Sequence, residues 1–336
     1  RHPTNIALHV AGVLASAALV VWAVVAGPLW LALLYPVVHV VPGLVGHRLF
    51  ERDAAVGDLR IGRRDYPGLW FIAANHRLTW RLGFRLTPRS EIGAMGIANR
   101  LVLLSPLTAG TANYVELMSA ADRTKLPPAM AATLSGAEGV KSMVMATPDA
   151  HKAQAELVAN GYGFAPPVHV KREWVIPGEG SVWPEFDVML PIAAPLPFNL
   201  CRYFNLDLYL REDWRQHPNG ARHLTATFAV APDAHATARY YEALLGKAAT
   251  LGADGAWIVK TAAVELAIYD PLSFAARFGV APIPGNAPYY AGYRVAVANG
   301  DTLRKLLARN EVAAIPTVLG IAVRACGNVI EFIEGR

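Results

Sequence analysis

Apolar residues are arranged differently in the first and the later parts of this chain. From Ile6 to Ala26 the sequence runs 21 residues with His9 as its only strongly polar member, and a second apolar run extends from Leu29 to Val45. About 20 consecutive apolar residues are enough for a helix to cross a bilayer. The pattern therefore predicts an all-α transmembrane hairpin over residues 1–50.

The residues after the second apolar run indicate which side of the membrane they occupy. Five arginines follow within a short distance: Arg48, Arg52, Arg60, Arg63 and Arg64. Such a density next to a membrane helix is typical of the cytoplasmic side. We expect a connector over residues 51–81, an inner or cytoplasmic membrane location, and the remainder in the cytoplasm. A signal peptide is the alternative, but no basic n-region or cleavage site is visible. The first residue is Arg1 rather than Met, so we expect a missing N-terminal segment.

From residue 82 onward, short apolar or alternating runs are separated by Gly, Pro and Asn, which predicts strands and turns. Longer amphipathic segments predict helices over residues 149–161, 234–246 and 301–310. Strands are expected at residues 82–89, 96–104, 113–118, 141–147, 168–175, 186–192, 198–204, 224–230, 264–268, 293–297, 317–323 and 329–333. The repeated order of strand, helix and two or three strands predicts an α+β fold of βαβββ modules, with domains over 82–205, whose first module is incomplete, and 206–336.

Three of the predicted strands contain a glutamate between apolar neighbours: Glu116, Glu265 and Glu331. Strand alternation sends each carboxylate to the opposite face from its neighbours. Three copies in a similar context indicate a repeated site, while the alternative is a solvent-facing or satisfied carboxylate at a strand end.

Composition narrows the classes of partner. The chain is 54% hydrophobic and 17% charged, with a net charge of +5 that comes from scattered arginines. No basic run interleaved with aromatic residues is present, so we expect no nucleic-acid partner. The two cysteines, Cys201 and Cys326, form no CxxC pair or disulfide framework, which fits a reducing compartment.

Histidines at the membrane segment are candidate metal ligands. His2, Asn5 and His9 share one helix face, and His47 and Glu51 share another. Imidazole is a common ligand for iron and zinc. The alternative is a set of interfacial polar anchors and helix caps.

The stretch from His2 to His9 and the later Gly46-His47-Arg48-Leu49-Phe50-Glu51 resemble the family of the yeast 2-hydroxy fatty-acid dioxygenase. The resemblance covers about residues 1–80. It implies Fe(II) and O₂ chemistry that shortens 2-hydroxy fatty acids, a fatty-acyl substrate, by one carbon at a membrane lipid surface. It also implies that His9 and His47 are iron ligands, with Glu51 as a ligand or as a group that orients one.

The remaining residues resemble a glyoxalase-like family of the vicinal oxygen chelate superfamily. The motifs that carry this resemblance are Leu82–Arg89, Gly96–Arg100 and His217–Ala221, together with the βαβββ order and the strand-borne glutamates. The resemblance implies half-barrels that hold a divalent metal, either Zn, Mn, Ni or Fe, between first and last strands of the modules. Glu116, Glu265 and Glu331 match the last-strand ligand position. The first-strand positions fall near Ser142, Ala226 and Gly292, and none of these is a usual ligand.

Other candidate roles surround these glutamates. We expect Glu116 and Glu265 to be catalytic, and His217 to act either as a general base or as a loop-forming residue. Asn99 and Tyr114 accompany Glu116 as expected substrate contacts. Trp174 and Trp183 either line a substrate cavity or belong to the core.

The sequence thus predicts a membrane-tethered glyoxalase-like protein. The first hypothesis is a metal-dependent isomerase, lyase or dioxygenase that acts on a small or acyl substrate. The alternative is a metal-free small-molecule binding module on a membrane anchor. The oligomeric state is not indicated by any sequence feature.

Overall fold

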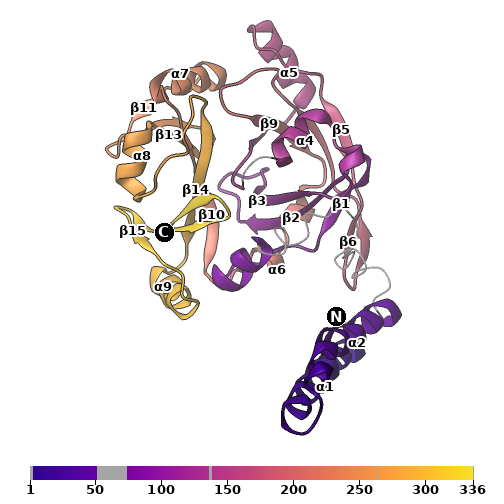
Figure 1. The fold of residues 1–336 in the computed structure, drawn as a ribbon. Helices are drawn as coiled ribbons and strands as arrows, with labels where there is room; N and C mark the ends of the chain where they lie inside the picture. Colours follow the sequence, from indigo (N-terminus) through magenta and orange to yellow (C-terminus); the bar gives the residue numbers. More distant parts are fainter. Residues whose placement is uncertain (1–2, 51–73, 136–137, 263, 336) are drawn as a thin grey trace. The chain divides into compact units, whose positions relative to one another are not determined.

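The computed structural model describes residues 3–50, 74–135, 138–262 and 264–335 (Figure 1). The chain divides into two compact units. The first contains Arg1–Tyr66 and Trp174–Val182, and the second contains Pro67–Glu173 and Trp183–Arg336.

The first unit is built mainly from apolar helices. They are α1 (Pro3–Val25), the 3₁₀ turn η1 (Leu29–Leu34) and α2 (Tyr35–Phe50), and the unit also holds strands β6 (Trp174–Ile176) and β7 (Gly180–Val182). Helix α1 packs on α2 where Ser16 Oγ lies 3.2 Å from His39 Nδ1. Among the described residues only α1 is long and apolar enough to cross a membrane, over Ala7–Val25, because the next apolar helical stretch, Leu29–Pro42, is shorter. The predicted transmembrane hairpin is therefore confirmed only as one helix of spanning length.

The N-terminal half of the second unit contains two small sheets. The first has the antiparallel order β1-β2-β3, and the second has the order β4-β9-β8-β5. The strands are β1 (Ser90–Ile92), β2 (Ile97–Leu104), β3 (Asn113–Ala120), β4 (Met143–Ala146), β5 (Val168–Lys171), β8 (Glu185–Met189) and β9 (Phe198–Tyr203). The helices and helical turns are η2 (Arg77–Arg81), η3 (Gly93–Met95), η4 (Arg123–Lys125), α4 (Pro128–Ser135), α5 (Ala150–Ala159), η5 (Leu206–Tyr209) and α6 (Glu212–Arg215).

The C-terminal half forms one mixed sheet from two βαβββ modules. Its strand order is β11-β12-β13-β10-β14-β17-β16-β15. The first module is β10 (Ala221–Val230), α7 (Ala234–Leu245), β11 (Thr250–Leu251), β12 (Trp257–Lys260) and β13 (Glu265–Tyr269). The second is β14 (Tyr289–Val297), α9 (Gly300–Arg309), β15 (Ile315–Pro316), β16 (Gly320–Ala325) and β17 (Asn328–Glu334). Strand β10 pairs with β13 in parallel, β14 pairs with β17 in parallel, and the two modules meet where β10 and β14 run antiparallel.

Opposite faces of this sheet are covered by different helices. Helices α7 and α9 bury apolar side chains such as Tyr241 and Leu303 on the face that also packs on the N-terminal half. The other face carries α8 (Pro271–Phe278), which lies between the two modules in sequence. Phe274 and Phe278 of α8 pack there against strand residues that include Phe228. We call this side of the sheet the α8 face.

Helix α8 has well-defined ends. The Asp270 side chain accepts hydrogen bonds from the backbone N–H groups of Leu272 and Ser273, and Pro271 occupies the first turn. Gly279 ends the helix in the left-handed conformation at φ 60°. These caps fix both ends of the short helix, whose Phe274 and Phe278 cover part of the α8 face.

Gly292 marks the closest approach of β14 to β17. A Cβ atom on Gly292 would lie 1.9 Å from the Val329 carbonyl oxygen, which is backbone and has no rotamer to change. We expect Gly292→Ala to lower the free energy of unfolding by about 1–3 kcal/mol or more, because a strand must shift. Urea unfolding of the full chain measures this.

The matched control is Gly93→Ala. Gly93 is exposed, and no atom lies within 4 Å of the position its Cβ would take. We expect a change within about 0.5 kcal/mol for this variant. Equal destabilisation by both substitutions would show that the β14–β17 contact is looser than described.

Candidate functional site

Eight residues meet inside the N-terminal half of the second unit and form what we call the Arg172 cluster. They come from β1, β2, β3, β9, η5 and the end of β5. The members are Ser90, Asn99, Tyr114, Glu116, Arg172, Cys201, Tyr203 and Tyr209.

Arg172 is the buried charge of this cluster, with 5% of its surface exposed. Its Nη1 donates to Asn99 Oδ1 at 2.7 Å and to Ser90 Oγ at 3.1 Å. Burial lowers the pKa of Arg172, but Tyr209 and Glu116 raise it more, so the net shift is upward and the guanidinium stays charged.

Asn99 connects this guanidinium to Glu116. Its Nδ2 donates to Glu116 Oε1 at 2.5 Å while its Oδ1 accepts from Arg172. Asn99 pairs with Met118 across β2 and β3, so Glu116 is its diagonal neighbour on the same face of the sheet. Since both ends of the amide are engaged, the half-buried Glu116 carboxylate is held in one orientation.

Tyrosines make up the rest of the cluster. The hydroxyls of Tyr114 and Tyr203 lie 2.5 Å apart, and Tyr209 stacks on Tyr114. Burial raises the pKa of Tyr114 well above its usual value, and the Glu116 carboxylate raises it further. Burial likewise raises the pKa of Cys201 to about 12. These groups therefore keep their protons at neutral pH.

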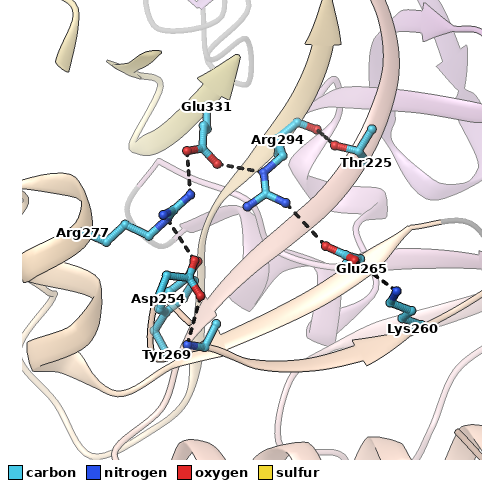
Figure 2. Close-up of polar contacts among 9 residues, drawn as sticks. Thr225, Asp254, Lys260, Glu265, Tyr269, Arg277, Arg294 and Glu331 are labelled. Carbon is cyan, nitrogen blue, oxygen red and sulfur yellow. Dashed lines mark hydrogen bonds and ion pairs between the residues drawn. The ribbon is translucent and has the colours of Figure 1, made fainter. Parts of the chain in front are cut away.

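A second polar network lies on the α8 face of the C-terminal sheet (Figure 2). Glu331 is fully buried at 0% exposure. Its Oε2 accepts from Arg294 Nε at 2.8 Å, and its Oε1 accepts from Arg277 Nη2 at 2.7 Å.

The same arginines reach two further carboxylates. Arg294 Nη1 lies 3.4 Å from Glu265 Oε2, and Arg277 Nε lies 3.2 Å from Asp254 Oδ2. Lys260 is a weaker partner of Glu265 at 3.8 Å. Figure 2 shows the Arg294 guanidinium between Glu331 and Glu265.

Strand register explains why these groups meet. Ala226 pairs with both Glu265 and Arg294, and Arg294 pairs with Glu331, so four positions form one row across β13, β10, β14 and β17. The first-strand partner of Glu331 is thus Arg294 rather than Gly292, which corrects the sequence-based assignment.

This donor set does not fit a divalent cation. Both oxygens of Glu331 are already bound by guanidinium groups, and the row supplies an alanine and an arginine where ligands would be needed. In the Arg172 cluster, Glu116 is the one carboxylate and lies near a positive charge. Within the described ranges no group of three or more His, Cys, Asp or Glu side chains is placed to hold a metal. Metal ligation by Glu116, Glu265 and Glu331 stays a prediction, and we derive no chemical step through it.

His217 is held by both ring nitrogens. Its Nδ1 accepts from the Arg85 backbone N–H at 2.9 Å, and its Nε2 donates to the Leu103 carbonyl oxygen at 2.8 Å. Burial lowers the pKa of His217 below its usual value. The geometry favours the loop-forming interpretation, because neither nitrogen is left for a substrate.

The other predicted residues are not members of the Arg172 cluster or of the network on the α8 face. His9 is exposed on α1 of the first unit, and Trp174 is buried on β6 of that unit. Trp183 is 48% exposed in the second unit. The side chain of His47 and the whole of Glu51 lie outside the described residues.

Comparison with family models identifies the larger part of the chain. Residues 72–245, more than half of the sequence, match the model described as a glyoxalase-like domain. The chain belongs to the glyoxalase-like domain family. Residues 1–56 match the model described as 2-hydroxy-palmitic acid dioxygenase Mpo1-like. Both resemblances inferred from the motifs are thereby confirmed.

Two solved structures are similar to this glyoxalase-like protein. A hypothetical protein from Staphylococcus aureus is 12% identical with a TM-score of 0.54, over 75% of this chain and 91% of that one. A mutant 4-hydroxymandelate synthase from Streptomyces coelicolor is also 12% identical, with a TM-score of 0.44 over 73% and 72% of the two chains. A comparison with curated proteins found no match.

The His217 ring provides a pH test of the fold of this glyoxalase-like protein. Because its folded pKa is depressed, the unfolded chain binds the proton more readily. Stability should therefore be constant above the unfolded pKa of about 6.5 and fall as the pH drops below it. We expect His217→Gln to destabilise by about 1–3 kcal/mol at pH 8, and this loss to shrink toward pH 5.

Urea unfolding between pH 5 and pH 8 measures this difference. The control is the exposed His151→Gln, which should not change the pH profile. A pH profile of His217→Gln that runs parallel to that of the parent chain would contradict the assignment.

Proposed function

We propose that this protein is a membrane-attached glyoxalase-like protein in which Glu116 exchanges a proton with a small bound molecule that carries a carbonyl group. The observation that carries this proposal is the hydrogen-bond chain from Arg172 through Asn99 to Glu116. It holds one partly accessible carboxylate beside a buried positive charge.

The surroundings of Glu116 suit the removal of a proton next to a carbonyl. A carboxylate in a fixed orientation acts as the base. The enolate that results needs hydrogen-bond donors or a positive charge at its oxygen. Tyr114 supplies a protonated hydroxyl, because its pKa is raised, and Arg172 supplies a charge that stays protonated.

The contacts in the C-terminal half support the proposal that the reaction needs no metal bound in that half. Arg294 places a permanent cation between Glu265 and Glu331. The corresponding acid of the N-terminal half, Glu116, is bound instead by a neutral amide. Its bonding partner is therefore neutral, which leaves the carboxylate available to act as a base.

Attachment to a membrane is supported by α1, which is apolar over Ala7–Val25, and by the Mpo1-like match at residues 1–56. Fe(II)-dependent oxidation of a fatty-acyl substrate by His9, His47 and Glu51 stays a prediction for that part, since the last two side chains are not described.

Binding without reaction is the second candidate function. It is favoured by the contact between the Tyr114 and Tyr203 hydroxyls, which satisfy each other at 2.5 Å without any ligand. A hydroxyl that is already paired is less available to stabilise an enolate, so this contact favours binding without reaction.

The two candidates differ in the effect of Glu116→Gln. We expect the full chain to catalyse deuterium incorporation from D₂O next to the carbonyl of some member of a panel of 2-oxo acids and acyl thioesters, followed by NMR. Glu116→Gln should slow this exchange by about 100-fold or more, because the base is lost. Chelator treatment should not change the rate.

Glu265→Gln is the matched control, since it alters the equivalent strand-borne glutamate of the C-terminal sheet. It should leave the exchange rate unchanged. Ligand binding with no exchange in either the parent chain or Glu116→Gln would favour the second candidate. Exchange that disappears with chelator would overturn the metal-free proposal.

A further inference from the structure

A cleft of about 750 Å³ opens at one end of the α8 face, and none of the Arg172 cluster residues lines it. Its walls come from η2, α8, β14, β15, β16 and β17. We propose that this cleft binds a molecule with an apolar chain and a single carboxylate head group. This site lies between η2 and the C-terminal sheet and does not depend on the function proposed for Glu116.

The floor of the cleft is apolar. Phe274, Ala291 and Val329 line it and are themselves more than nine-tenths buried in the fold. Tyr289 and Ile315 extend this surface along the edge of the sheet. A volume of about 750 Å³ lies within the range of small-molecule sites, and an apolar floor is what their ligands cover.

Arginines supply the polar part of the wall. Arg77, Arg81 and Arg324 line the cleft, and Glu311 is the one acidic residue among its lining residues. The lining thus carries a net charge of three minus one, or +2. A guanidinium binds a carboxylate through two parallel hydrogen bonds, so an anionic head group fits here.

Two of these arginines retain their charge uncompensated in the described structure. Arg81 Nη2 donates to the Glu311 backbone carbonyl oxygen at 2.8 Å, and Arg324 Nη2 donates to the Gly279 carbonyl oxygen. Both acceptors are neutral. Arg77 differs, because its Nη1 lies 3.4 Å from Glu138 Oε2. Arg81 and Arg324 are therefore the groups that the head group of the ligand would meet.

The charge of the lining favours an anionic head group, because a net charge of +2 attracts anions. The combination of two open guanidiniums and an apolar floor points to an anionic amphiphile, and a carboxylate is a head group that a guanidinium binds through two parallel hydrogen bonds.

Cys326 makes the proposal measurable without knowledge of the natural ligand. It lines the cleft and is partly exposed, whereas Cys201 is buried in the Arg172 cluster. These are the two cysteines of the chain. Alkylation of Cys326 reports occupancy of the cleft, and alkylation of Cys201 reports loss of the fold.

The experiment follows iodoacetamide labelling of the full chain in lipid nanodiscs at pH 8.5 by mass spectrometry, with decanoate as the probe. Decanoate at about ten times its dissociation constant should slow Cys326 labelling about tenfold, because about nine-tenths of the clefts are then occupied. Decanol, which lacks the charge, and acetate, which lacks the chain, should bind at least about tenfold more weakly, so at the same concentration each should slow labelling by about twofold or less.

Arginine variants test whether decanoate protection depends on the charge of the cleft or only on an intact fold. Arg81→Gln and Arg324→Gln each keep a donor for the carbonyl contact and should weaken decanoate protection about tenfold in apparent dissociation constant. The control Arg304→Gln removes an exposed arginine of α9 that pairs with Asp301 outside the cleft, and it should change nothing.

Other outcomes would overturn the proposal. Protection by decanol equal to that by decanoate would show an apolar cleft without head-group recognition, and no protection by either would remove the site. Unchanged protection in both arginine variants would also overturn it. Glu116→Gln should leave decanoate protection intact, so failure of the proposed catalysis and failure of this cleft are distinguishable.

Discussion

The ion pairs of Glu331 are the constraint on which the C-terminal half depends. A carboxylate at 0% exposure can keep its charge only if partners replace the water it has lost. Arg277 and Arg294 do this from different elements, α8 and β14, and so connect the helix to the sheet. Removal of one partner of such a pair typically costs about 3–5 kcal/mol. The position of α8, and with it the wall of the cleft, therefore depends on this pairing.

Similar strand-borne glutamates have different partners in the two halves of the second unit. In the C-terminal sheet, Glu265 and Glu331 are neutralised by a guanidinium that sits in their own row. In the N-terminal half, the buried charge of Arg172 reaches Glu116 only through the amide of Asn99. Compensation of the C-terminal acids stabilises packing, whereas Glu116 stays partly accessible beside a neutral amide. The reactive role proposed for Glu116 rests on this difference.

Regular elements were predictable because their signals are local. The helices expected over residues 149–161, 234–246 and 301–310 correspond to α5, α7 and α9 within a few residues. Helix α8 was missed although Asp270-Pro271 and Gly279 are cap signals. Its eight residues lie between two strand patterns and are too few to show the helical period clearly. Grouping of Asn99, Tyr114 and Glu116 was foreseen in part, since they lie on neighbouring strands.

Long-range partners were beyond the reach of sequence patterns. Arg172 is 73 residues from Asn99, and nothing local links them. Arg294 and Glu331 pair across β14 and β17 without a register shift, but the pairing of Ala226 with Arg294 follows a shift between Leu224 and Ala226 in the β10–β14 pairing. The sequence alone shows neither this shift nor which residue of β14 lies opposite Glu331.

The central claim is that the guanidinium of Arg294 is the cation between Glu265 and Glu331. The most direct test of this claim is equilibrium dialysis of Co²⁺ against the full chain, Glu265→Gln and the double variant Ala226→His/Arg294→His. We predict that the parent chain and Glu265→Gln bind the same number of Co²⁺ ions, and that the double variant binds one more, because it replaces the guanidinium with ligands beside Glu265 and Glu331. Binding of one more Co²⁺ ion by the parent chain than by Glu265→Gln would contradict the role assigned to Arg294.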